Sequence, residues 1–280
     1  METWLLPAWA IGSVAVAMAL LGFEAALRAL SPGVYARSRY LYMSIALVLS
    51  PVFWAAVRQA PALLGAVGLV LWSVAFFARS MDSGQGGWVL AFVSAGVLAS
   101  WLMPSLLFVL APLAVVLLSE HSRWRWVVVA GMVVGAAGWV WGAGNGVLSG
   151  PAGLTAWSLR YFFIKPDGTP NAALLWQPLV HPFFCLPLPG LLLLFKKTDV
   201  GLYARRALTF SMTALMLYFS GLYALTPLQL LPIYALLLLL LFPAWDRFFA
   251  YGSYFFPRLT RGLLAAAVAI QLMALIFFHT

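Results

Sequence analysis

Ten long apolar segments dominate the sequence, and short gaps separate most of them. A helix needs about 20 residues to cross the hydrocarbon of a bilayer, within a range of roughly 17–25. Because the segments have this length or are somewhat shorter, each is predicted to be a membrane-spanning helix. The predicted spans are Trp4–Phe23, Tyr40–Val57, Ala62–Ala78, Trp88–Leu102, Ser105–Leu118, Trp126–Gly144, Leu174–Phe195, Ala207–Leu225, Leu228–Trp245 and Gly262–Phe278.

The basic residues fall almost entirely into alternate gaps between these segments. Loops on the cytoplasmic side of a membrane retain Lys and Arg, so the bias predicts the orientation of every span and places both termini on the outer side. The cytoplasmic set is Arg28, Arg37, Arg39, Arg79, Arg123, Arg125, Lys196, Lys197, Arg205, Arg206, Arg247, Arg258 and Arg261, and the outer set is Arg58, Arg160 and Lys165.

Composition agrees with a membrane protein. Hydrophobic residues make up 64% of the chain and charged residues 8%, whereas soluble domains carry about 25% charged residues. We predict one all-α, polytopic domain over residues 1–280 in a bacterial cytoplasmic (inner) membrane. The net charge of +9 is spread over short cytoplasmic gaps, so it indicates topology and contact with membrane lipids rather than nucleic acid. Met1-Glu2-Thr3 lacks the basic region of a signal peptide, so the first span is expected to be retained.

The acidic residues favour ion pairs and turns over catalysis. None falls in the middle of a predicted span, which argues against a proton-coupled transporter. Glu24 precedes Arg28 by four residues and is expected to pair with it. Asp167 lies in a Pro-Asp-Gly turn. We therefore predict no catalytic residue, and because Cys185 is the single cysteine, no internal disulfide and no multi-cysteine metal site can form. The acids at cytoplasmic helix ends are Asp82, Glu120, Asp199 and Asp246.

The longest polar gap, residues 145–173, is predicted to be an outer loop. Long loops in compact domains are usually functional or disordered. The apolar and aromatic stretch Leu154–Ile164 predicts a short helix in the membrane interface. Arg160 and Lys165 run against the charge bias. They either extend towards the interface from apolar surroundings or contact a lipid phosphate, for which both side chains are suited.

Two apolar spans carry features beyond length. His181 stands among four prolines in the seventh span, where distorted backbone is tolerated if it lines a cavity or is buried in protein. His181 is therefore either part of a packed kink or a residue that binds a ligand or pigment. In the sixth span, Gly131, Gly135 and Gly138 have a spacing that allows two helices to approach closely.

Several stretches resemble the GT-C superfamily of polyprenyl-phosphate-sugar-dependent glycosyltransferases. In those proteins a late helix often opens with an R-[FY]-L-L-P-x-x-P-like sequence. Here Gln229 stands near the position of that Arg, and Tyr234 stands where a second proline is common. The stretches that carry the resemblance are Phe219-Ser220-Gly221, Thr226–Tyr234, Phe242-Pro243-Ala244-Trp245, Ser50–Trp54 with Leu63-Leu64-Gly65, and the tight helical pair Trp88–Leu118 with Pro104 at its joint. That pair is either a hairpin that reaches the outer face or a re-entrant pair.

The resemblance implies a GT-C-like fold in which the outer loop helps to bind a lipid-phosphate donor. Arg160 and Lys165 then become lipid-phosphate contacts, and His181, Gln229 and Tyr234 become cavity-lining residues. No cofactor is predicted beyond a polyprenyl-phosphate or phospholipid ligand. GT-C enzymes place a catalytic acid on their first outer loop. Aligned by topology, this chain is expected to begin at the second helix of the family, with no counterpart of that loop.

Three functions follow as hypotheses. The first is a non-catalytic or incomplete scaffold subunit of a larger membrane complex, which binds lipid or other membrane protein subunits. The second is a glycosyltransferase that uses a polyprenyl-phosphate sugar and takes its catalytic acid from another chain. The third is a cofactor- or pigment-associated membrane subunit that uses His181.

Overall fold

The computed structural model of the protein describes residues 8–31, 37–120, 122–144, 202–220 and 227–242, and single residues between 258 and 273. These residues form helices joined by short connections and contain no strand, which confirms the all-α class for this part of the chain. The α-helices are α1 (Ala8–Leu30), α2 (Arg37–Val48), α3 (Pro51–Gln59), α4 (Pro61–Ser83), α5 (Gly86–Leu102), α6 (Leu107–Glu120), α7 (Arg125–Gly144), α10 (Leu202–Ser220) and the helix of Leu231–Phe242. Three 3-10 turns accompany them: η1 (Pro104–Leu106), η2 (Ser122–Trp124) and η6 (Pro227–Leu230).

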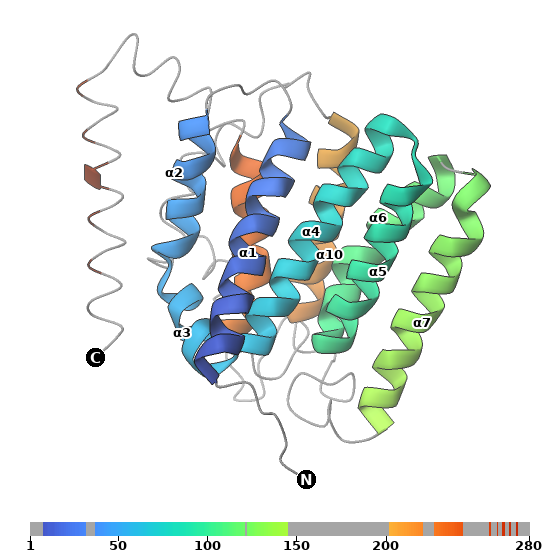
Figure 1. Ribbon diagram of the computed structural model, residues 1–280, viewed down its shortest axis with the longest axis horizontal. Coiled ribbons are helices and arrows are strands. Elements are labelled where there is room, and N and C mark those ends of the chain that lie inside the picture. Colours follow the sequence, from blue (N-terminus) through green and yellow to red (C-terminus); the bar gives the residue numbers. More distant parts are fainter. Residues whose placement is uncertain are drawn as a thin grey trace.

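The helices stand side by side, and α4 lies at the centre (Figure 1). It packs most extensively against α1 and α5 and also contacts α3, α6 and α10. From α1 to α7 the chain runs alternately up and down the bundle, with α2 and α3 together forming one downward run (Figure 1). The C-terminal ends of α1, α4 and α6 and the N-terminal ends of α2, α5 and α7 therefore share one edge, which we call the basic edge.

The basic edge collects the cytoplasmic set of basic residues that the described helices carry. Arg28 lies in the last turn of α1 and Arg79 lies four residues before the end of α4, while Arg37 and Arg125 open α2 and α7. Arg58, in the last turn of α3, belongs to the opposite edge. Among the described residues, Arg58 of the outer set thus lies at the edge opposite to Arg28, Arg37, Arg79 and Arg125. The assignment of the basic edge to the cytoplasm stays a prediction.

The surface between the two edges is apolar. Large hydrophobic side chains are exposed on several helices, including Val14 of α1, Leu41 of α2 and Val133 of α7. Exposed apolar side chains on several helices are typical of a surface that contacts a membrane or another protein. By length and composition, two helices among the described residues could cross a membrane, Ala10–Leu30 and Pro61–Ser83. The shorter apolar helices are Gly86–Leu102, Pro104–Glu120, Arg125–Gly138 and Leu231–Phe242.

The predicted number of ten spans stays a prediction, because the seventh span, Leu174–Phe195, lies outside the described residues. The tenth is described at a few positions only, among them Gly262 and Met273, which are helical and exposed. The fourth and fifth predicted spans form a helical hairpin, in which Met103 and η1 join α5 to α6.

The second predicted span is wrong as a continuous helix. It divides into α2 and α3 at Ser50 because Pro51 has no N–H to continue the hydrogen-bond ladder. Ser50–Trp54, which resembles an outer loop in sequence, is thus a joint followed by the first turns of α3. The connection from α3 to α4 is the single residue Ala60.

Small residues let α1 and α4 touch through their backbones. A Cβ atom on Gly22 would lie 2.8 Å from the Gly68 carbonyl oxygen, and a Cβ atom on Gly68 would lie 2.9 Å from the Ala19 nitrogen. Ala15, Ala19, Gly22 and Ala26 recur every three or four residues of α1, and all four are buried. Close contact of this kind increases the van der Waals attraction between two helices. That attraction matters in a bilayer, where lipid tails are as apolar as the helix surfaces and no hydrophobic effect drives the helices together.

Aromatic side chains bind α4 to α5 near the basic edge. The Trp72 and Phe76 rings lie 5.5 Å apart, and Phe76 stacks on Trp88 of α5 at 5.8 Å. The Arg79 guanidinium lies 4.9 Å from the centre of the Trp88 ring, close enough for a cation–π interaction. Gly84 reverses the chain between the two helices with φ +65°, a left-handed conformation that favours glycine. Rings and basic groups at this level are typical of membrane–water interfaces.

Candidate lipid-binding cavity

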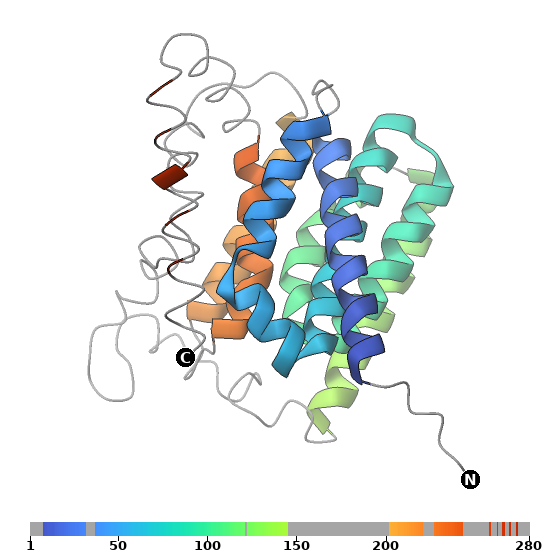
Figure 2. The same ribbon diagram turned by 60° about the vertical axis from the view of Figure 1, so that its left-hand side comes forward.

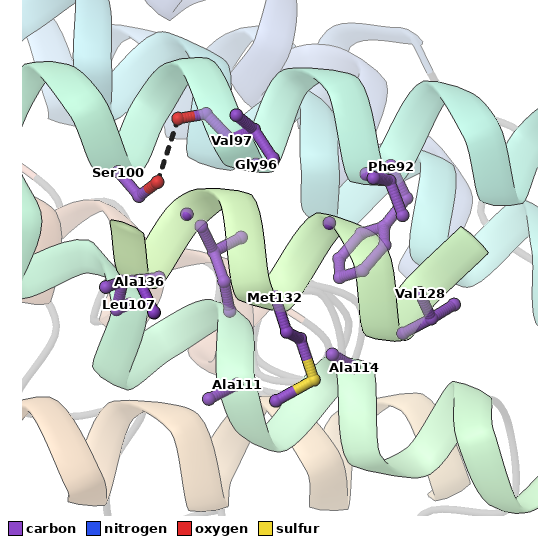
Figure 3. Close-up of a pocket in the computed structure, with 14 residues that line it drawn as sticks. Phe92, Gly96, Val97, Ser100, Leu107, Ala111, Ala114, Val128, Met132 and Ala136 are labelled. Carbon is purple, nitrogen blue, oxygen red and sulfur yellow. Dashed lines mark hydrogen bonds between the residues drawn. The ribbon is translucent and has the colours of Figure 1, made fainter. Parts of the chain in front are cut away.

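An apolar cavity of about 190 Å³ lies between α5, α6 and α7 (Figure 3). It is the size of a small hydrocarbon site, since an engineered cavity of about 150 Å³ accommodates benzene. Its lining from α5 is Phe92, Val93, Gly96, Val97 and Ser100, from α6 Leu107, Leu110, Ala111 and Ala114, and from α7 Val128, Gly131, Met132, Gly135 and Ala136.

The cavity exists because α7 is held against α5 more closely than against α6. A Cβ atom on Gly131 would lie 2.3 Å from Val93 Cγ1, so a larger residue there would force the Val93 side chain or the helix to shift. At Gly138 a Cβ atom would lie 2.2 Å from the indole nitrogen of Trp101, and that nitrogen donates to the Val134 carbonyl at 3.2 Å. The predicted packing role of the α7 glycines is confirmed, and the space that remains beside α6 is the cavity.

The chemistry of the lining favours a hydrocarbon ligand. Ser100 supplies the one side-chain hydroxyl among the lining residues, and its Oγ donates to the Val97 carbonyl within α5 at 2.8 Å (Figure 3). A sugar or a phosphate would lose its hydration here without adequate polar partners. A segment of an acyl or isoprenoid chain loses nothing comparable, so the cavity suits the tail of a lipid rather than its headgroup.

Tyr234, one of the predicted cavity-lining residues, lies in the packed core beside the α2–α3 joint. Its side chain is 1% exposed, and its hydroxyl donates to the Ala46 carbonyl at 3.0 Å. That carbonyl is accessible because the Ser50 N–H bonds to Leu47 at 3.2 Å, one residue nearer than in a regular α-helix. The Tyr234 hydroxyl therefore supplies a donor to the Ala46 carbonyl, which the α2–α3 joint leaves without its usual backbone N–H donor.

The other predicted site residues are not brought together by the described structure. Arg160, Lys165 and His181 lie outside the described residues, and Gln229 is placed only by its backbone in η6. Tyr234 does not line the cavity of α5, α6 and α7. The lipid-phosphate and cavity-lining roles of these five residues stay predictions.

Sequence reasoning missed two buried serines at helix joints. Among the described residues, the Ser50 and Ser105 hydroxyls are buried without a hydrogen-bond partner. Both residues adjoin a proline, Pro51 and Pro104 respectively, so a serine beside proline within an apolar region is the signal that could have found them. Each hydroxyl adds an unsatisfied polar group at a point where the helical ladder is already interrupted.

Acidic side chains in the described part of the chain gather towards the basic edge. Glu24 forms the expected ion pair with Arg28, which is confirmed. Asp82 and Glu120 are exposed in the last turns of α4 and α6. The described ranges hold no group of three or more potential metal-binding side chains. These acids thus belong to the edge opposite to that predicted to face outward.

The comparison with solved structures finds ArnT from Cupriavidus metallidurans, determined with bound undecaprenyl phosphate. The superposition has a TM-score of 0.56 at 19% sequence identity, and it covers 84% of this chain and 46% of ArnT. The chain thus spans about half the length of ArnT. No family model matches the sequence, and no curated protein does so either. Since ArnT is a GT-C glycosyltransferase, the likeness confirms the resemblance inferred from sequence at the level of fold, and the chain has a GT-C-like membrane fold.

Proposed function

We propose that this chain is a multi-pass, GT-C-like subunit of a bacterial inner-membrane complex. It binds the hydrocarbon tail of a polyprenyl phosphate or phospholipid and does not itself carry out sugar transfer. The observation that carries the proposal is the apolar α5–α6–α7 cavity, set in a fold shared with a protein that binds undecaprenyl phosphate.

The lipid part of the proposal follows from the shape of the cavity. Its volume of about 190 Å³ accepts a segment of about six carbons, by comparison with benzene-sized cavities. The remainder of a long tail would lie along the exposed apolar surface of α7, where Val133 and Val140 are 62% and 65% exposed. The phosphate would meet Arg160 and Lys165 on the outer loop, as the sequence predicts.

The scaffold part rests on where the described acids lie. A GT-C-type transfer uses an acidic side chain on the outer side, whereas Glu24, Asp82 and Glu120 belong to the basic edge. Glu24 is moreover engaged by Arg28. These three acids are consequently unsuited to act on a sugar at the outer face. In this proposal, binding and positioning of lipid is the role of the chain, and chemistry is the role of a partner.

The fold itself favours one alternative, in which the chain is part of a functioning glycosyltransferase. The similarity to ArnT extends over 84% of this chain, which is more than one lipid-binding helical hairpin would require. Another chain would then contribute the catalytic acid, and transfer would occur only in the assembled complex.

Affinity purification from native membranes in mild detergent separates the two roles. The scaffold proposal expects a second membrane protein to copurify and polyprenyl phosphate or phospholipid to be retained. A lone, lipid-free monomer would contradict it. If the purified complex transfers sugar from a polyprenyl-phosphate donor, the alternative holds, and loss of transfer on removal of the partner would identify the partner as the source of the acid.

A further inference from the structure

Two turns of the chain lie at the basic edge (Figures 1 and 2). One joins α4 to α5 through Gly84, and the other, η2, belongs to the connection from α6 to α7. The Trp124 ring of η2 lies directly against Gly86 at the start of α5, where a Cβ atom on Gly86 would overlap it. The ring can lie there because residue 86 has no side chain, so this contact positions η2 on the end of α5.

Four consecutive residues at this contact are exposed, Arg123, Trp124, Arg125 and Trp126, and we call them the Arg-Trp patch. The Arg125 Nε donates to the Leu118 carbonyl of α6 at 3.1 Å, which orients the guanidinium and leaves its two terminal amino groups for a ligand. Within the described part of the chain, neither arginine forms an ion pair. The patch therefore presents two guanidinium groups that can bind an anion.

The order of residues along α7 matches the order of groups in a phospholipid. Arg125 is the first residue of α7, at the basic edge, and Trp126 and Val129 follow towards the middle of the bundle. The three lie on one face, since Val129 follows the other two by three or four residues, and Trp126 is 83% exposed and Val129 37%. Tryptophan is typical of the level where headgroups meet hydrocarbon. A phosphate beside Arg125 would thus continue into a glycerol beside Trp126 and an acyl chain beside Val129.

The charges around the two turns favour a lipid with a net negative charge. Arg79, Arg123 and Arg125 supply three guanidinium groups, whereas Asp82 and Glu120 supply two exposed carboxylates. Positive charge is therefore in excess, as it is in the juxtamembrane segments that attract anionic lipids. A zwitterionic lipid would gain less, because its ammonium group cancels the charge of its phosphate.

We propose that the Arg-Trp patch binds one anionic phospholipid, of the phosphatidylglycerol type, from the leaflet at the basic edge. The Arg125 and Arg123 guanidinium groups contact its phosphate, to which their planar arrays of donors are suited, and the Trp126 indole lies beside its glycerol. This site is independent of the proposed function. None of the four patch residues lines the α5–α6–α7 cavity, and the lipid enters from the edge opposite to that proposed for the phosphate of the polyprenyl lipid.

Native mass spectrometry of the full chain tests the role of charge. The purified protein is titrated with phosphatidylglycerol and with phosphatidylethanolamine that carries the same acyl chains. We expect the wild type to bind phosphatidylglycerol more tightly, and Arg125→Gln to weaken that binding about fivefold, the effect of one basic group near an anionic membrane surface. Arg28→Gln is the matched control, because it removes a positive charge from the same edge at a residue that Glu24 already engages. It should keep the wild-type affinity.

A pair of glycine variants tests the geometry of the site without changing its charge. Gly86→Ala should push the Trp124 ring and the two arginines beside it away from α5, and so weaken the binding of phosphatidylglycerol several-fold. At the adjacent Gly87 no atom lies within 4 Å of a built Cβ atom, so Gly87→Ala should bind the lipid as the wild type does. Thermal unfolding checks that both variants are folded.

Three results would overturn the proposal. The first is equal binding of the two lipids by the wild type, and the second is an unchanged affinity for phosphatidylglycerol in Arg125→Gln or in Gly86→Ala. An effect of Arg125→Gln alone would indicate a general attraction between a charged edge and anionic lipid rather than a positioned site. The third is displacement of the lipid by inorganic phosphate at equal concentration, because the occupant would then be a soluble anion.

Discussion

The hydroxyl of Tyr234 donates to the main-chain carbonyl of Ala46 at 3.0 Å, between residues 188 positions apart in sequence. This bond ties the helix of Leu231–Phe242 to α2 next to the α2–α3 joint. It forms because Pro51 interrupts the ladder, so that Ser50 bonds to Leu47 and the Ala46 carbonyl accepts a side-chain donor instead. The Tyr234 hydrogen bond therefore depends on the break between α2 and α3.

Tyr234→Phe should lower the free energy of unfolding by about 1 kcal/mol, the scale of a buried hydrogen bond between membrane helices. Pro51→Ala would let the ladder continue and supply Ala46 with a backbone donor. In that background we expect Tyr234→Phe to cost clearly less. Denaturant unfolding of the four proteins of this double-mutant cycle measures the difference, and equal costs in both backgrounds would show that the bond and the joint are unrelated.

Gly68 and Gly65 are neighbours on α4 with opposite surroundings. Gly68→Ala should destabilise the protein by about 1–3 kcal/mol, the cost of overpacking, because the new Cβ atom would meet the α1 backbone. At Gly65 no atom lies within 4 Å of a built Cβ atom, so Gly65→Ala should be neutral or stabilising, helped by the higher helix propensity of alanine. Thermal unfolding in detergent compares the two, and an equal loss in both would refute the close α1–α4 contact.

Ala136→Phe should plug the α5–α6–α7 cavity, because Ala136 lines it. The adjacent Ala137 is exposed on α7 and does not line the cavity, so Ala137→Phe is the matched control. We expect the first variant to retain several-fold less polyprenyl phosphate after purification, and the second to retain the wild-type amount. Lipid extraction with mass spectrometry provides the measurement. If both variants keep their lipid, the tail lies elsewhere.

Arg160→Ala combined with Lys165→Ala should weaken retention of polyprenyl-phosphate lipids if the outer loop holds the phosphate. Each lost charge-assisted contact is worth about 1.5–3 kcal/mol when well formed, so a decrease of tenfold or more is expected. The same double variant should leave retention of a polyprenol without phosphate unaltered. Unchanged lipid content in the variant would favour interfacial anchoring as the role of the two side chains.

Topology can be tested at the N-terminus. In a Cys185→Ser background, Thr3→Cys should react with a membrane-impermeant thiol reagent added to the outer face of intact cells, since the charge bias places that end outside. Labelling that requires broken cells would reverse the predicted orientation. A cysteine at Asp82, exposed near the basic edge, should show the opposite accessibility and serves as the internal control.

Local sequence patterns predicted much of the helical framework. Apolar length located α4, α5 and α7 to within a few residues at most ends, and charge bias anticipated the common edge that Arg28 and Arg79 share. The Glu24–Arg28 pair and the close packing at Gly131 needed only helical spacing. The Glu24–Arg28 pair depends on residues four positions apart on one helix, whereas the spacing of Gly131 marked a position of close packing without naming its partner, Val93 of α5.

Features that join distant segments could not be predicted in this way. The contact of Gly22 with Gly68 depends on how α1 crosses α4, and no spacing within either helix specifies that crossing. The α5–α6–α7 cavity is likewise the space left by three packing distances, one of which is set by Trp101 lying over Gly138. Tyr234 was singled out from a motif, but its bond to Ala46 requires the displaced ladder at Ser50, which only the fold reveals.

The contact between α1 and α4 also imposes an order on the synthesis and membrane insertion of the protein. Gly22 finds its partner only after Gly68 has itself left the exit tunnel of the ribosome, by which time α2 and α3 have emerged as well. Until then, the small-residue face of α1 has no helix to receive it, although Ala10–Leu30 is apolar enough to enter the bilayer alone. The first helix of this chain is therefore inserted early and docked late, and lipid or the insertion machinery must cover its face during that interval.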